Sequence, residues 1–158
     1  MLPEEVAKLI GKRGEASIME VESGAIKRYS DAVGDDTCLY TDADYANAAD
    51  HAAMIAPYGY FGWPVKWKGP MPLASELRQE VINVITKAGC PRVLDGGIEY
   101  EFYALVFSGD TLIAESVVAD IQEKEGKTGR MFLTTIETTY RNIAGSVVGK
   151  ERKITIQR

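Results

Sequence analysis

The residues between Ala32 and Asp42, which read AVGDDTCLYTD, form the strongest local pattern for chemistry in the sequence. Asp35 follows a glycine that ends a helical stretch, and Tyr40 comes five residues later. A carboxylate can activate water or accept a proton, whereas a phenol with an ordinary pKa of about 10 stays protonated near neutral pH and donates hydrogen bonds. The structural alternatives are that Asp35 caps the turn and that Tyr40 is a packing residue.

A second candidate segment, Met54 to Trp67, is apolar and is interrupted by prolines. Its aromatic side chains either line a ligand channel or fill the core. Gly59 and Gly62 would let a ligand or another part of the backbone approach closely. The aromatic residues of this segment are Tyr58, Tyr60, Phe61, Trp63 and Trp67.

Histidine and cysteine are scarce, which limits the chemistry of the chain. His51 is the single histidine, and no other type of side chain has an unperturbed pKa suited to proton transfer near neutral pH. We assign His51 no role. Cys38 and Cys90 form no CxxC motif, so the sequence indicates neither a disulfide framework nor a Cys/His zinc site. We expect no metal and no other cofactor.

Length and charge narrow the class of protein further. With 158 residues the chain falls in the size range of one domain, so we expect a single domain over residues 1–158. The formal net charge of −5 and the scattered basic residues argue against a nucleic-acid partner. No apolar run approaches the roughly 20 residues that span a bilayer, and the N-terminus lacks the apolar stretch of a signal peptide. We expect a cytoplasmic protein without membrane contact.

The first half of the sequence predicts helices and the second half predicts strands. Helical spacing of apolar residues favours helices over 3–10, 24–33, 43–48 and 73–88, with a short strand at 18–21. Leu73, Leu77, Val81 and Ile85 share one face of the last helix. Strands are expected over 98–107, 111–123, 129–142 and 147–157. We predict an α+β layer architecture, an antiparallel meander covered by helices.

The segments described so far occur in an order that resembles the MaoC-like hydratases, and more closely their FAS1-like dehydratase branch. This is the amino-terminal type of domain found in (R)-specific enoyl-thioester hydratases and 3-hydroxyacyl-carrier-protein dehydratases. The resemblance implies a hot-dog fold, a curved antiparallel sheet wrapped around a central helix and paired with a second unit. It rests on the loop from Gly34, then Tyr45-Ala46, Ile55-Ala56-Pro57, Asp95-Gly96-Gly97 through Phe102, and Gly109-Asp110-Thr111-Leu112.

The resemblance also assigns roles to the residues of the loop. In active members the loop reads Gly-Asp-x-Asn-Pro-hydrophobic-His, and the aspartate and histidine hold a water for addition to a 2-enoyl thioester. Asp35 keeps the aspartate and Leu39 the hydrophobic residue. Thr37, Cys38 and Tyr40 replace the asparagine, the proline and the histidine. Asp35 and Tyr40 are therefore the candidate catalytic residues, and Tyr40 is a poor general base.

A backbone N–H near Tyr58 or Gly59 is implied to polarise the thioester oxygen. The candidate substrate-binding residues are Ile55, Pro57, Tyr58, Gly59 and Phe61.

Three functions follow from this pattern. The first is the histidine-lacking, acyl-binding half of a hydratase or dehydratase whose catalytic MaoC-type subunit completes a heterodimer. The second is an independently active homodimeric lyase, or an acyl-CoA thioesterase that uses Asp35. The third is a non-catalytic protein that binds an acyl thioester. In each case the ligand is a thioester of coenzyme A or of acyl carrier protein, and a dimer is expected because a strand edge is left for pairing.

Overall fold

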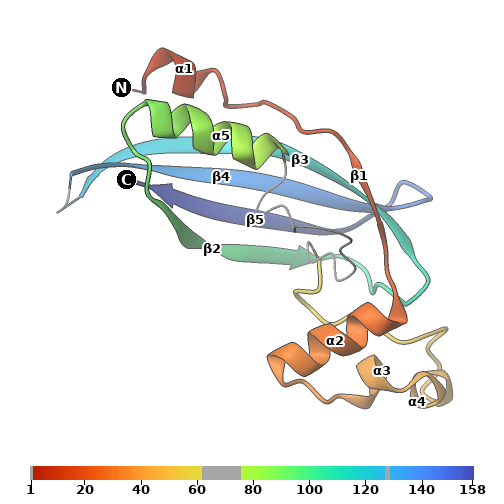
Figure 1. Cartoon of the computed structure of the whole chain (residues 1–158). Helices are drawn as coiled ribbons and strands as arrows, with labels where there is room; N and C mark the ends of the chain where they lie inside the picture. The colour runs from red at the N-terminus through yellow and green to blue at the C-terminus, as the bar shows by residue number, and fades with distance from the viewer. Residues whose placement is uncertain (1, 62–75, 127–128) are drawn as a thin grey trace.

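The computed structural model describes residues 2–61, 76–126 and 129–158. Its centre is a five-stranded antiparallel sheet in the order β1-β3-β4-β5-β2 (Figure 1). The three long strands β3, β4 and β5 are consecutive hairpins, and β1 and β2 lie at the two edges. The strands are β1 (Ser17–Glu20), β2 (Val93–Phe102), β3 (Thr111–Gly126), β4 (Gly129–Asn142) and β5 (Val147–Gln157).

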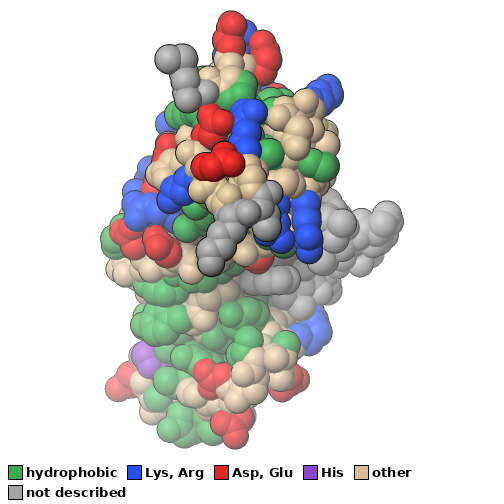
Figure 2. Space-filling model, turned by 90° about the vertical axis from the view of Figure 1, so that its left-hand side faces the viewer, with side chains coloured by type: hydrophobic (Ala, Val, Ile, Leu, Met, Phe, Trp, Pro, Cys, Tyr) green, Lys and Arg blue, Asp and Glu red, His purple; other side chains and the backbone are tan. Residues whose placement is uncertain are grey.

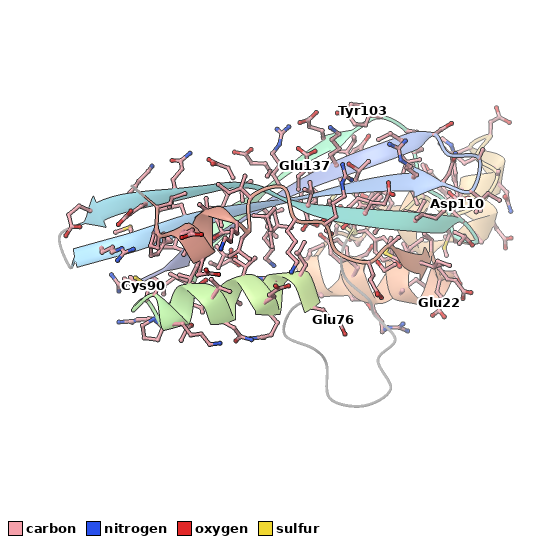
Figure 3. All side chains as sticks on the ribbon, turned by 90° about the horizontal axis from the view of Figure 1, so that it is seen from above. Glu22, Glu76, Cys90, Tyr103, Asp110 and Glu137 are labelled. Carbon is pink, nitrogen blue, oxygen red and sulfur yellow. The ribbon has the colours of Figure 1, made fainter. Side chains whose placement is uncertain are left out.

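Five helices accompany the sheet in the described residues: α1 (Glu4–Ala7), α2 (Ser23–Val33), α3 (Cys38–Thr41), α4 (Ala43–Ala48) and α5 (Glu76–Lys87). Helix α5 lies along one face of the sheet, and α2, α3 and α4 gather beyond one end of it (Figure 1). Seen from above, α5 lies on one side of the sheet, whereas Tyr103 and Glu137 project from the other side (Figure 3). We call the side that α5 covers the inner face. None of the described helices is long and apolar enough to cross a membrane.

Helix α5 forms one hydrophobic core with the inner face. Leu77, Val81 and Ile85 are buried on one side of the helix, as their spacing predicts, whereas Leu73 lies outside the described residues. They belong to one cluster with Val118 and Phe132 of the sheet. Polar contacts fix the helix at its end: the Gln157 amide donates to the carbonyl oxygens of Ile82 and Cys90, at 3.1 and 3.3 Å.

A second hydrophobic core lies under α2 at the other end of the sheet. Ala25 and Ile26 of α2 pack with Phe61, Leu112 and Tyr140. Tyr29, Tyr40 and Tyr100 pack against the same cluster and are only partly buried. This core therefore joins the loop of the first candidate pattern to the second candidate segment.

The prediction of a simple meander is wrong for β2. This strand pairs with β5 rather than with β3, because the chain between β2 and β3 crosses the end of the sheet instead of making a hairpin. Its predicted range, 98–107, is also displaced from Val93–Phe102. The strand begins earlier because a bulge at Asp95 to Gly97 carries the pairing through the glycines. It ends earlier because Ala56 N–H donates to the carbonyl of Val106, which withdraws that segment from the sheet.

Candidate functional site

Helix α2 places the Asp35 loop by ending abruptly. Gly34 has φ 73° and ψ 28°, the left-handed conformation that closes a helix and that glycine adopts without a Cβ penalty. The Asp35 amide donates to the Ser30 carbonyl at 2.9 Å, and the Gly34 amide donates to the Asp31 carbonyl at 3.3 Å. The predicted helix end at Gly34 is confirmed, and it turns Asp35 toward the next short helix, α3.

The carboxylate of Asp35 is held by its own loop. Its Oδ1 accepts hydrogen bonds from the Thr37 hydroxyl at 2.6 Å and from the Thr37 amide at 3.1 Å. These two donors hold the pKa of Asp35 below its usual 3.8, the hydroxyl having the larger effect. Thr37 thus holds the aspartate as the cap of a turn. Asp35 is ionised near neutral pH and is a weak base.

Tyr40 lies on α3, half-buried against the second core. Burial raises the pKa of its hydroxyl, and the negative charge of Asp35 and the nearby Tyr58 raise it further. Asp35, Tyr40 and Tyr58 are therefore close enough to interact electrostatically. No hydrogen bond joins Asp35 to Tyr40 within the described ranges. At neutral pH the Tyr40 phenol keeps its proton, so it donates hydrogen bonds and accepts no proton.

Backbone hydrogen bonds hold the second candidate segment beside this loop. The Ile55 amide donates to the Leu39 carbonyl at 3.0 Å, and the Ala56 amide donates to the Val106 carbonyl at 2.7 Å. Ile55 also forms an isolated antiparallel bridge with Phe107. Ile55 and Pro57 are buried as a result. The segment is thus fixed both to the Asp35 loop and to the end of the sheet.

Residues Pro57 to Tyr60 form a tight turn at the centre of the site. The Tyr60 amide donates to the Pro57 carbonyl at 3.0 Å, and Gly59, at the third position, has φ 88°. A positive φ at this position is typical of a type II turn, whose two central amides make no turn hydrogen bond. Neither the Tyr58 amide nor the Gly59 amide donates to another described residue. The turn therefore presents two unpaired N–H donors.

Aromatic rings surround this turn. Tyr58 is 64% exposed, and its ring centroid lies 4.6 Å from that of Phe102. Phe61 is buried and stacks on Tyr140, with 4.8 Å between ring centroids. The Tyr29 hydroxyl comes so close to Gly59 that a Cβ there would lie 2.8 Å from it. Three of the candidate binding residues are buried beneath the turn: Ile55, Pro57 and Phe61. The other two, Tyr58 and Gly59, reach the surface.

The structure adds a polar group that sequence reasoning missed. Glu151 of β5 lies half-buried on the inner face and accepts a hydrogen bond from the Tyr140 hydroxyl at 3.2 Å. Burial raises the pKa of Glu151, whereas Tyr140 and Lys153 partly oppose that rise. The one sequence signal is that Glu151 shares its strand face with Thr155 and Gln157. Because all three are polar, this alternation does not reveal a buried face.

A metal centre finds no support in the described part of the chain, where no three His, Cys, Asp or Glu side chains converge. The site instead combines the unpaired amides of the turn, the hydrogen-bonded carboxylate of Asp35, the protonated phenol of Tyr40 and the surrounding aromatic rings. Such a set can bind and polarise a carbonyl oxygen. Its own groups provide no base with a pKa near neutrality.

Comparison with known proteins places this geometry in a family. The family model described as "FAS1-like, dehydratase domain region" matches residues 8–151. A curated relative, the probable enoyl-CoA hydratase alpha subunit of Thermomonospora curvata, is 28% identical over 134 residues, which cover 80% of this chain and 41% of the relative. The chain therefore spans less than half the length of that relative.

Solved structures show the same fold at low sequence identity. A chain of the ChsH1–ChsH2 complex from Mycobacterium tuberculosis matches with a TM-score of 0.80 and 18% identity, over 98% of this chain and 94% of that chain. The truncated HadBC (3R-hydroxyacyl-ACP dehydratase) complex from the same organism matches with a TM-score of 0.68 and 13% identity, over 94% of this chain and 96% of that chain. The R-hydratase PhaJ1 of Pseudomonas aeruginosa matches with a TM-score of 0.61 and 18% identity, over 95% of this chain and 83% of that chain.

The expected hot-dog fold is thus confirmed, and the chain belongs to the FAS1-like dehydratase domain family.

Proposed function

We propose that this chain is the histidine-lacking, acyl-thioester-binding subunit of a two-subunit enoyl-thioester hydratase or 3-hydroxyacyl-thioester dehydratase. The proposed partner is a MaoC-type subunit that supplies the catalytic aspartate and histidine. In this proposal the chain binds the acyl thioester, and its partner performs the addition or removal of water.

The state of the loop carries the proposal. Hydration across a double bond needs a group that takes a proton from water and a group that delivers one to the adjacent carbon. Tyr40 occupies the histidine position, and burial together with the Asp35 charge raises its pKa further above neutrality. Asp35 accepts a hydrogen bond from the Thr37 hydroxyl, which lowers the pKa of its carboxyl group. Asp35 and Tyr40 therefore give the loop no base of suitable strength.

The turn from Pro57 to Tyr60 supports a binding role. Its two unpaired amides offer a thioester oxygen the donors that polarise a carbonyl, and they need no particular side chain. The aromatic side chains of Tyr58 and Phe102 lie beside these donors and suit an acyl chain.

The surface supports a partner subunit. Charged side chains cover the upper half of the face shown in Figure 2, and hydrophobic side chains gather below them. Val33, Tyr45 and Tyr58, from or near α2 to α4, are each more than half exposed. Contiguous apolar surface is a common mark of a protein interface. Two of the similar structures are complexes of two named proteins, and the curated relative is named as an alpha subunit.

Co-expression tests the proposal. The chain would be produced with a MaoC-type protein whose loop has both the aspartate and the histidine, purified through a tag on this chain, and offered a 2-enoyl-CoA. We expect the two proteins to purify together and to hydrate the thioester. We expect this chain alone to be inactive and the partner alone to be inactive or much slower. Failure to associate, together with no gain in hydration, would refute the proposed function.

A further inference from the structure

The inner face contains a polar row that separates the two hydrophobic cores. Ser116 is in register with Thr138, Thr138 with Glu151, and Glu151 with Tyr100, so the four side chains cross β3, β4, β5 and β2 in one line. Residues directly opposite each other in a sheet project from the same face. The neighbouring row on one side contains Val118 and Ile136 of the first core, and that on the other contains Ala114 and Tyr140 of the second.

Within this row, the Ser116 and Thr138 hydroxyls form a hydrogen bond with each other, whereas Glu151 and Tyr100 do not. The Ser116 and Thr138 hydroxyls are 2.9 Å apart. The hydrogen bond that Glu151 receives comes from Tyr140, and no second described side chain donates to its carboxylate. The Tyr100 hydroxyl makes no hydrogen bond with a described residue. Burial raises its pKa to about 12.

A third hydroxyl links this group to the turn of the proposed thioester site. Tyr29 of α2 interacts electrostatically with Tyr100, and its own hydroxyl makes no hydrogen bond in the described part of the chain. A Cβ at Gly59 would lie 2.8 Å from the Tyr29 hydroxyl and 4.0 Å from the Tyr100 ring. Unpaired hydroxyls of two tyrosines therefore extend from the Gly59 turn toward Glu151.

The Tyr29 and Tyr100 hydroxyls and the Glu151 carboxylate, whose one described donor is Tyr140, keep hydrogen-bonding capacity between the two apolar clusters that a bound ligand can use. We propose that Tyr29, Tyr100 and Glu151 form a subsite for a hydroxyl group on the acyl chain of the bound thioester. The ligand hydroxyl accepts a hydrogen bond from Tyr100 and donates one to Glu151, and Tyr29 lies on the thioester side. This inference rests on the proposed function, because it assigns an acyl thioester to the adjacent turn.

The chemistry of the three groups selects a hydroxyl over the alternatives. An oxo group would accept from Tyr100 and would add no donor to the Glu151 carboxylate beyond the Tyr140 hydroxyl. An ammonium group would suit Glu151, but the positive charge of Lys153 already acts on this carboxylate and opposes a second cation. A plain hydrocarbon chain would leave both groups unpaired. A group that both donates and accepts satisfies the pair, and a hydroxyl is the smallest such group.

Calorimetric titration of the full chain tests the subsite with three ligands: hexanoyl-CoA and its 3-hydroxy and 6-hydroxy derivatives. We expect at least one hydroxylated ligand to bind about tenfold more tightly than hexanoyl-CoA, the effect of a well-placed hydrogen bond. Preference for the 3-hydroxy derivative would assign the subsite to the hydroxyl that hydration creates. Preference for the 6-hydroxy derivative would assign it to a hydroxyl already present on the chain.

Two variants assign the preference to these side chains. Tyr100→Phe keeps the ring that stacks on Phe102, and it should abolish the preference for the hydroxylated ligand. Glu151→Gln should reduce the preference, because a neutral amide replaces the carboxylate. Tyr103→Phe is the matched control: its hydroxyl bonds Glu101 on the opposite face, and it should keep the full preference (Figure 3).

Equal affinities for all three ligands would overturn the subsite and leave the proposed function standing. A preference that survives Tyr100→Phe would overturn it as well. If none of the three thioesters binds, the thioester-binding role fails, and the subsite fails with it.

Discussion

Replacing Gly59 with alanine tests the geometry of the Pro57 to Tyr60 turn. The φ of 88° is in the left-handed region, where a side chain costs about 1–2 kcal/mol. A Cβ would also lie 2.8 Å from the Tyr29 hydroxyl, which must move or push the turn aside, at a further cost of about 1 kcal/mol. We therefore expect Gly59→Ala to lower the free energy of unfolding by about 2–3 kcal/mol.

Two companion variants separate the two costs. Gly34→Ala meets the same positive φ with no atom within 4 Å of the new Cβ, so it should lose only about 1–2 kcal/mol. In a Tyr29→Phe background, Gly59→Ala should cost about 1 kcal/mol less than in the wild type, because the colliding hydroxyl is gone.

Urea denaturation of the four proteins in the Tyr29 and Gly59 cycle, with Gly34→Ala beside them, measures these differences. Calorimetry with hexanoyl-CoA on the same proteins tests whether the Tyr58 and Gly59 amides bind the thioester. Gly59→Ala should weaken binding, and Gly34→Ala should leave it unchanged. If Gly59→Ala costs no more than Gly34→Ala, and Tyr29→Phe does not alter its cost, the close approach of Tyr29 to the turn is wrong.

Three further predictions concern the core, the loop and the inner face. Ile85→Ala removes a fully buried side chain of α5 and should cost about 2–5 kcal/mol by urea denaturation; a loss below about 1 kcal/mol would contradict its packing. Thr37→Val should raise the pKa of Asp35 toward 3.8 in a carboxyl NMR titration, and an unchanged value would exclude the Thr37 hydroxyl as its cause. Burial raises the pKa of Glu151 above 4.5, so the unfolded chain releases this proton first and stability falls as pH rises through the folded pKa. Stability data collected as the pH rises above 4.5 should therefore show a gain for Glu151→Gln relative to the wild type, and a loss there would contradict the raised pKa.

The sequence predicted local features whose causes are local. The end of α2 at Gly34, the buried side of α5, and the bounds of β4 and β5 all follow from glycine conformation and apolar spacing. The displaced range of β2 had a cause elsewhere in the chain, because its last predicted residues bond to the segment at Ala56. Non-local pairing of this kind has no signature within the strand itself.

The candidate site divides in the same way. The order of short motifs identified the Asp35 loop and the segment from Ile55 to Phe61, and the structure places the two side by side. The sequence did not show that Thr37 occupies the Asp35 carboxylate or that Tyr29 lies over Gly59. Glu151 was missed because its buried surroundings come partly from β2, which is distant in sequence, and its own strand face is polar. Burial of a polar side chain depends on the whole fold.

Hydration of crotonyl-CoA by the purified chain alone tests the central claim most directly. We predict no hydration above the uncatalysed rate, and the same result for the wild type and Asp35→Ala. Turnover by the wild-type chain that Asp35→Ala abolishes would contradict it, because the chain would then have its own catalytic carboxylate.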